Sequence, residues 1–247
     1  MKRTLQIIAL LCMAVVVYSA TTGFSFLNRV DEVEQSEKII KKEFPVSAFD
    51  VVELSGVADV EFSQSPKLQV EVSCPESLLP YVVVTSEKGV LKVDTRDMKK
   101  MRRNDKLKVK ISASTLKRLS NQGVGNFKLT SSLETEQLTI FNQGVGDMRM
   151  SGLKCGNMDI TNKGVGNLYL SGTAGKVNCR SHGVGDVQAK DLKATDVILV
   201  HSGVGNVTCY ASKTISIKSF GVGDVSYYGK PRVLKKIKKS TGSVQRK

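Results

Sequence analysis

The tripeptide Gly-Val-Gly recurs six times in the second half of the chain, and this repeat constrains the fold more than any other feature. Its successive copies are 21, 20, 19, 20 and 18 residues apart. Their first glycines are Gly123, Gly144, Gly164, Gly183, Gly203 and Gly221. A period near twenty residues is typical of proteins that stack similar supersecondary units.

Apolar residues recur at fixed positions when the repeats are aligned on the first glycine. The position four residues before it holds Leu119, Ile140, Ile160, Cys179, Leu199 and Ile217. Apolar and polar residues alternate on both sides of the glycines, which predicts two half-buried strands per repeat. So short a unit cannot bury a core alone, and the glycines weaken any helix. We therefore predict an all-β fold, a parallel β-helix or β-solenoid with coils of about 20 residues.

The glycines are expected at a tight corner of each coil, where positive φ or close backbone approach excludes other residues. The full set is Gly123, Gly125, Gly144, Gly146, Gly164, Gly166, Gly183, Gly185, Gly203, Gly205, Gly221 and Gly223. We expect the intervening valines to point inward or to seal the edge of the sheet; they are Val124, Val145, Val165, Val184, Val204 and Val222.

The residue after the second glycine alternates strictly between asparagine and aspartate. The series is Asn126, Asp147, Asn167, Asp186, Asn206 and Asp224. Such side chains bond nearby backbone N–H groups, so we interpret the series as a structural corner ladder. A calcium site is the alternative, but aspartates two coils apart lie too far from each other to share one ion. No metal, cofactor or catalytic residue is assigned.

Polar residues just before the glycines are candidates for a ligand surface. They are Gln122, Gln143, Lys163, His182 and His201. A Ser–His–Asp arrangement of Ser181 or Ser202 with these histidines and Asp186 is the enzymatic alternative, which would act on acidic polysaccharides. We favour a non-enzymatic adhesin-like or scaffolding module that binds a glycan or a protein along its coils.

The remaining segments are assigned from composition. Residues 1–20 have the cationic start and apolar run of a signal peptide, cleaved or retained as an anchor, so the protein is expected to be exported to the periplasm, the outer surface or the medium. Residues 21–43 are interpreted as a linker and 44–228 as the solenoid, with degenerate capping coils over 44–118 and the Gly-Val-Gly repeats over 119–228.

Residues 229–247 form a basic tail. They carry eight of the chain's 37 Lys and Arg residues and no acid, within a net charge of +14. We expect a solvated end there; an anionic surface is the alternative partner, and the absence of interleaved aromatics argues against nucleic acid. Four cysteines lie outside the signal, and Cys179 and Cys209 fall in core columns; the disulfide state of these two and of Cys74 and Cys155 is left open.

Several motifs in order resemble a known family. They are Phe44 and Phe49, the Leu54–Val60 strand and corner, the Gly89–Val93 hairpin, the Leu107–Leu119 strand, and then the glycine corners. This order is similar to the putative auto-transporter adhesin head domain, or head GIN domain, over about residues 44–228. The resemblance implies an exported β-helical protein of Gram-negative bacteria with an adhesin role, and it supplies no active-site residues.

Overall fold

The computed structural model describes residues 38–95 and 106–247. Residues Ile39–Lys247 form one compact unit, which is almost entirely β-structure. The predicted signal peptide and most of the predicted linker lie outside the described residues. No helix in the described part of the chain has the length and apolarity needed to cross a membrane.

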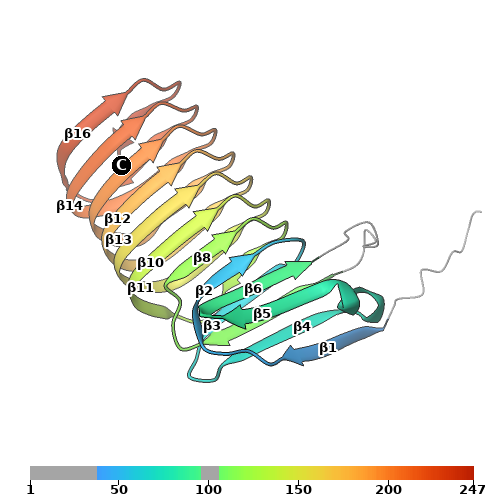
Figure 1. The fold of residues 1–247 in the computed structure, drawn as a ribbon. Coiled ribbons are helices and arrows are strands. Elements are labelled where there is room, and N and C mark those ends of the chain that lie inside the picture. The colour runs from blue at the N-terminus through green and yellow to red at the C-terminus, as the bar shows by residue number, and fades with distance from the viewer. Residues whose placement is uncertain (1–37, 96–105) are drawn as a thin grey trace, which may run out of the picture. The chain divides into compact units, whose positions relative to one another are not determined.

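The Gly-Val-Gly region folds as stacked parallel coils, which confirms the predicted β-solenoid (Figure 1). Residues one repeat apart pair in register, so that Ile140 lies beside Ile160 and Ile160 beside Cys179. The same column continues through Leu199 and Ile217. The strands of this region are β8 (Arg118–Asn121), β9 (Phe127–Leu129), β10 (Leu133–Asn142), β11 (Met148–Asn162), β12 (Leu168–Ser181), β13 (Val187–His201), β14 (Val207–Ser219) and β15 (Val225–Tyr228).

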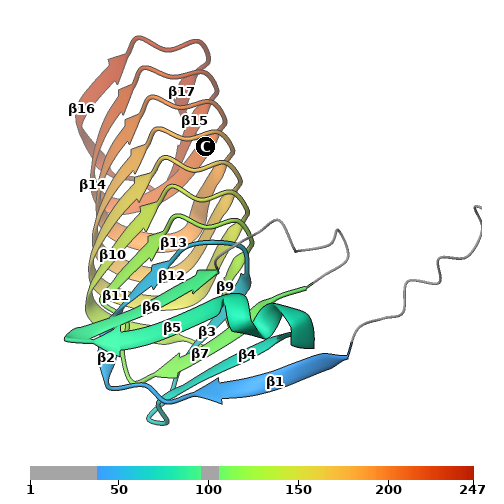
Figure 2. The same cartoon turned by 45° about the vertical axis from the view of Figure 1, so that its right-hand side comes forward.

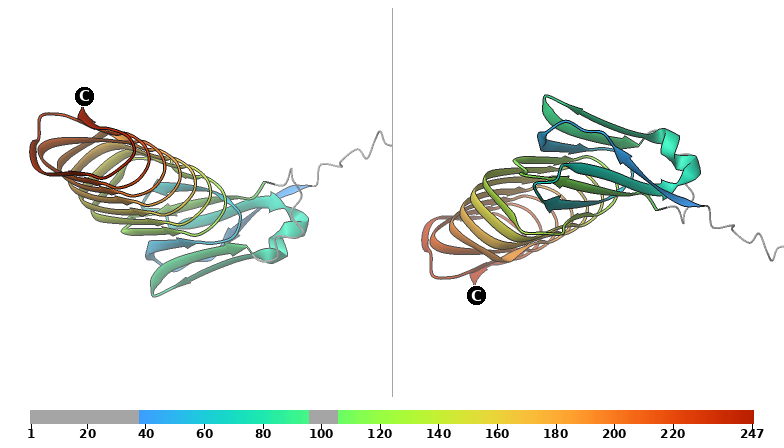
Figure 3. Two further views of the ribbon diagram at one scale, coloured as in Figure 1. Left: turned by 90° about the horizontal axis from the view of Figure 1, so that it is seen from above. Right: turned by 90° about the horizontal axis from the view of Figure 1, so that it is seen from below.

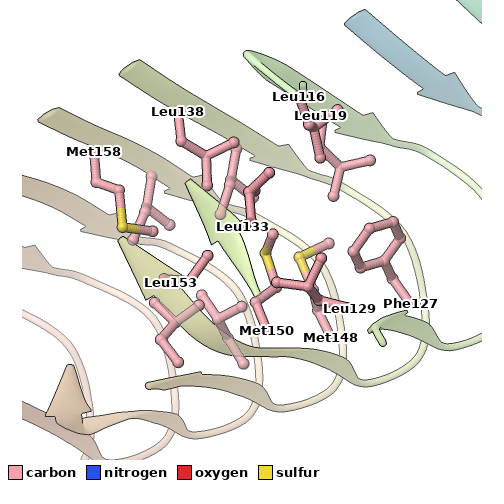
Figure 4. Close-up of a cluster of buried hydrophobic side chains, with 14 of the residues drawn as sticks. Leu116, Leu119, Phe127, Leu129, Leu133, Leu138, Met148, Met150, Leu153 and Met158 are labelled. Atoms are coloured by element: carbon pink, nitrogen blue, oxygen red, sulfur yellow. The ribbon is translucent and has the colours of Figure 1, made fainter. Parts of the chain in front are cut away.

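The apolar columns form a continuous core inside the stack. Leucine, methionine and phenylalanine side chains from successive coils pack on one another, as Figure 4 shows for Phe127, Met148 and Leu153. All four described cysteines are buried, and none of them forms a disulfide with another described cysteine. Burial raises the pKa of Cys155 to about 11 and that of Cys179 and Cys209 to about 12, so these thiols pack as small apolar groups.

The N-terminal part contains two degenerate coils, as predicted, together with antiparallel strands that were not predicted. Strands β2 (Phe49–Leu54) and β3 (Asp59–Gln64) pair in parallel with β8 and β9, and Val57 between them bridges to Val124. Strands β6 and β7 pair in parallel with β2 and β3 and form the second coil. The other pairs are antiparallel: β1 with β4, β4 with β7, and β5 with β6. These elements are β1 (Ile39–Phe44), β4 (Gln69–Pro75), the 3₁₀ helix η1 (Glu76–Tyr81), β5 (Val82–Glu87), β6 (Gly89–Thr95) and β7 (Lys108–Ala113). Part of the predicted linker, residues 39–43, is therefore strand.

Residues 229–247 are not a solvated tail but a further coil of the solenoid (Figure 2). Strand β16 (Arg232–Lys238) pairs in parallel with β14, and β17 (Val244–Arg246) pairs with β15. At the corner between them, Thr241 bridges to Val222, and Gly242 has φ of 126°. In Figure 3 this coil overlies the preceding ones at the end of the stack marked C.

Candidate functional site

Side-chain direction at the corner follows a simple parity. Positions are counted from the first glycine of each repeat. Positions −4, −2 and 0 face the interior, and positions −1 and +1 face solvent. In the fourth repeat, for example, Ser181 and Gly183 are buried while His182 and Val184 are exposed. The alternation of the preceding strand thus continues through the first glycine.

The valines at position +1 form an exposed row, so the prediction that they point inward or seal the edge is wrong. Their exposed fractions lie between 47% and 50%. Each valine bridges in parallel to the valine of the next coil, from Val124 to Val222. We call this set the valine row; it comprises Val124, Val145, Val165, Val184, Val204 and Val222.

The glycines let the coils approach closely enough for this row to form. A Cβ atom on Gly164 would lie 2.4 Å from the carbonyl oxygen of Gly144 in the preceding coil. Gly166 has φ of 126°, and its Cβ would lie 2.3 Å from the oxygen of Gly146. Between the two glycines, the Val165 N–H donates to the Gly144 oxygen at 2.9 Å. The corner is therefore a tight hydrogen-bonded ladder that only glycine can build.

The Asn/Asp corner ladder links successive coils through hydrogen bonds from backbone N–H groups to side-chain oxygens. The Asn126 Oδ1 accepts the N–H of Asp147 at 3.0 Å, and the Asp147 Oδ1 accepts the N–H of Asn167 at 2.8 Å. The pattern continues through Asp186, Asn206 and Asp224. The hydrogen bond from the Asn167 backbone holds the pKa of Asp147 below its usual value. No cluster of three or more His, Cys, Asp or Glu side chains suited to a metal occurs in the described residues.

His201 is not on the surface. It stands at position −2 and is fully buried in an internal polar column, whereas His182 stands at position −1 and is exposed. The column comprises Asn121, Asn142, Asn162, Ser181, His201 and Ser219. Its asparagines are joined by side-chain hydrogen bonds, but neither ring nitrogen of His201 has a hydrogen-bond partner in the described structure. The sequence contains a signal for this burial. His201 lies two residues before Gly203, and alternation along the strand turns that position toward the interior.

The buried imidazole makes stability depend on pH. Burial lowers the pKa of His201 below its ordinary value of 6.5; the Val222 backbone acts in the opposite direction, and His182 lowers it further. Below about pH 6.5 the unfolded chain therefore binds a proton that the folded chain resists. The contribution of His201 to stability is fully present above that pH and is lost as the pH falls through its lowered pKa.

We expect the melting temperature to fall between about pH 7.5 and about pH 5, and His201→Asn to remove most of that fall. The chain has only two histidines, so His182→Asn is the matched control and should leave the fall unchanged. Thermal unfolding followed by circular dichroism checks both variants. A decline equally steep in His201→Asn and in the unmodified protein would contradict the prediction.

The remaining exposed candidates form one column beside the valine row. Gln122, Gln143, Lys163 and His182 all stand at position −1, with Ser202 and Phe220 continuing the column. The His182 Nδ1 atom is hydrogen-bonded to the Ser202 Oγ atom. Ser181 lies in the buried column instead, and no carboxylate among the described residues hydrogen-bonds to His182. We call the valine row and this polar column together the corner surface.

Sequence reasoning missed a polar cleft in the N-terminal part. Its volume is about 440 Å³, and it is lined by Lys41, Glu61, Ser63, Gln69, Glu71, Lys110, Ile111, Ser112 and Thr130. In the strand register, Glu71 of β4 and Glu61 of β3 both lie opposite Lys110 of β7. The sequence indicates which positions of these strands face outward, because they alternate with apolar ones. It does not indicate which strands pair, and that pairing brings the residues of the cleft together.

Comparison with solved structures shows the same architecture in other bacterial proteins. A putative adhesin from Bacteroides fragilis is 30% identical, with a TM-score of 0.82, over 86% of this chain and 98% of that chain. A putative adhesin from Parabacteroides merdae (22% identical, TM-score 0.63, over 86% of this chain and 97% of that chain) shares the fold. So does a putative lipid binding protein from Parabacteroides distasonis, at 24% identity and a TM-score of 0.62, over 86% and 98% of the two chains.

None of the curated proteins matches the chain. The family model described as putative auto-transporter adhesin, head GIN domain, matches residues 48–231, which include strands β2 to β15 and all six Gly-Val-Gly corners. The resemblance found in the sequence is thereby confirmed, and the chain belongs to the family of the putative auto-transporter adhesin head GIN domain.

Proposed function

We propose that this chain is an exported, non-enzymatic adhesin-like module of the cell envelope, and that its corner surface binds a polysaccharide along the stacked coils. The observation that carries the proposal is the valine row, in which six β-branched apolar side chains remain about half exposed in six successive coils. Apolar side chains scattered singly over a surface need no explanation, but a continuous row of them marks an interaction site.

Folding alone does not require valine at these positions. Thr241 occupies the same column in the last coil and bridges to Val222 as the valines bridge to one another. Threonine has nearly the shape of valine and similar strand propensity, so it satisfies the backbone equally well. The use of valine in six successive coils therefore favours a role for the apolar surface itself.

The chemistry beside the row favours a carbohydrate chain. Amide, hydroxyl and imidazole groups of Gln122, Gln143, His182 and Ser202 follow it along the stack. The apolar ring faces of a sugar can pack on the valines while its hydroxyls bond to these polar groups. Since a valine with a polar neighbour returns in each coil from Gln122 to Ser202, about 4.8 Å apart, a repeating polymer makes many weak contacts whose energies add.

The corner offers little support for catalysis. The Oδ1 atoms of Asp147, Asp186 and Asp224 accept backbone N–H groups, and an asparagine separates each aspartate from the next. Paired carboxylates acting on one glycosidic bond would need to lie within about 5–10 Å of each other with their oxygens free. Release of soluble products from a bound polysaccharide would contradict the non-enzymatic part of the proposal.

The test is affinity electrophoresis of the protein through gels containing neutral soluble polysaccharides, with and without calcium. We expect replacement of Val165, Val184 and Val204 together by threonine to weaken retention about tenfold. Each valine is about half exposed, so completing the burial of one methyl contributes about 0.4 kcal/mol, or about 1.2 kcal/mol for the three. The matched control replaces Ile198 and Val200 by threonine, since both lie on the outer face of β13, away from the corner surface.

Both variants should melt close to the unmodified protein. Equal loss of retention in the two variants, or unchanged retention in the valine variant, would overturn the proposal. If no polysaccharide retained the protein and an envelope protein bound through the valines instead, the choice of a polysaccharide as ligand would be wrong.

A further inference from the structure

We propose that the coil formed by residues 229–247 docks on an anionic lipid bilayer. This surface, which we call the basic end face, is separate from the corner surface and goes beyond the function proposed above. Because these residues fold as a coil, their charges are held on a rigid platform and not on a solvated tail.

The first observation is the charge. All eight basic residues of this coil are exposed, and none of them forms an ion pair in the described part of the chain. They are Lys230, Arg232, Lys235, Lys236, Lys238, Lys239, Arg246 and Lys247. Asp224 of the preceding corner contacts this coil: hydrogen bonds from Ser243 lower its pKa most, and the charges of Lys247 and Lys238 lower it further. Eight unpaired cations together attract an anionic partner.

The second observation is where three of these cations stand. Lys236 pairs with Ile217, Lys238 with Ser219, and Arg246 with Tyr227. Those three partners belong to columns that face the interior in the preceding coil. A charged side chain cannot enter the apolar core, so these cations lie at the exposed end of the stack. They add charge to that end in addition to the outward Lys235 and Lys239.

The third observation distinguishes a bilayer from other anions. The register of β14 and β16 shifts between Ile215 and Ser216, which leaves Leu234 without a partner residue. Leu234 is 58% exposed, and Val233 beside it is 40% exposed. Exposed apolar residues among lysines are the composition of surfaces that bind the headgroup region of a membrane. Binding of a highly charged polyanion such as heparin would depend on the cations and would not need the leucine.

Lysines on an open edge strand also have a simpler role, since they prevent pairing with other strands. That role accounts for the charges but not for the exposed Leu234, which would favour aggregation. Each lysine near an anionic membrane contributes about 1 kcal/mol, so the face has more charge than stable attachment needs.

The experiment measures co-sedimentation of the full chain with vesicles of phosphatidylcholine, alone or with about one-third phosphatidylglycerol. We expect binding only to the anionic vesicles, and weaker binding as salt rises above about 0.1 M. Glutamine at Lys235, Lys236, Lys238 and Lys239 should lower the partition coefficient by at least about 100-fold. A matched control places glutamine at four exposed lysines of earlier coils, Lys128, Lys154, Lys176 and Lys190, and should change it only a few-fold.

Leu234→Ser tests the apolar part without a change of charge. It should weaken vesicle binding several-fold and leave retention on heparin unchanged. Residues 1–37 are the same in all variants, so any contribution from them is common to all. The proposal would be overturned by equal losses of vesicle binding in the two lysine variants or by vesicle binding that does not depend on salt. Retention on heparin without binding to anionic vesicles would also overturn it.

Discussion

Replacing Gly166 by alanine should lower the free energy of unfolding by more than about 4 kcal/mol, which for a fold of this kind means little folded protein at ambient temperature. The new Cβ would lie 2.3 Å from the oxygen and 2.6 Å from the carbon of the Gly146 carbonyl. Both are backbone atoms of the preceding coil, so relief requires the coils to separate. Separation would lengthen the hydrogen bonds between these two coils, from Val165 N to Gly144 O at 2.9 Å and from Gly146 N to Val165 O at 2.8 Å.

Urea unfolding followed by circular dichroism measures this loss, with Gly89→Ala as the matched control. Gly89 also has a positive φ, of 80°, but the nearest atom to its Cβ would be the Asp50 Oδ1 at 3.8 Å. The control therefore introduces the strain of a positive φ at alanine without a steric clash. It should lower the free energy of unfolding by only about 1–2 kcal/mol. Similar losses at Gly89 and Gly166 would show that the close approach of the coils is not what requires glycine.

The solenoid could be predicted because its coils repeat. Columns such as Ile140, Ile160 and Cys179 appear in the sequence once the glycines are aligned, and the parallel register places the same residues side by side. Two predictions at the corner were wrong because the parity of the strand was not followed through the first glycine. That parity turns Val184 outward and His201 inward.

The antiparallel strands of the N-terminal part could not be predicted in the same way. Alternation of apolar and polar residues is identical in parallel and antiparallel strands, so the sequence does not reveal which pairing occurs. Residues 44–118 contain no repeat that would fix the partner of each strand. The last coil escaped recognition for another reason: its corner reads Ser240-Thr241-Gly242, with one glycine and no valine.

The candidate sites also differ in whether the sequence alone reveals them. The corner surface could be found from the sequence because its residues recur at one position of the repeat. The polar cleft could not, because Glu61, Glu71 and Lys110 come from three strands that are distant in the chain. The basic end face combines both cases. Its charge was visible in the sequence, but its position across the core columns appears only when β16 is placed against β14.

Replacing Asn142 by alanine should lower the free energy of unfolding by about 3–5 kcal/mol. Two buried donors lose their partner, and the buried Asn162 Oδ1 loses one of its two donors and keeps the Gly164 N–H. Asn142 accepts from the Asn121 Nδ2 at 3.0 Å and from the Gly144 N–H at 3.3 Å, and it donates to the Asn162 Oδ1 at 2.9 Å. All three groups belong to buried residues of the corner.

Asn126→Ala is the matched control, because it removes the same side chain from the exposed ladder. The Asn126 Oδ1 also accepts a backbone N–H, that of Asp147 at 3.0 Å, but water can replace it there, so the expected cost is about 1 kcal/mol or less. Urea unfolding gives both values, and amide exchange should show faster exchange at Gly144 only in Asn142→Ala. Equal costs at the two positions would mean that water reaches the internal column, and His201 would then lose the burial from which its pH dependence follows.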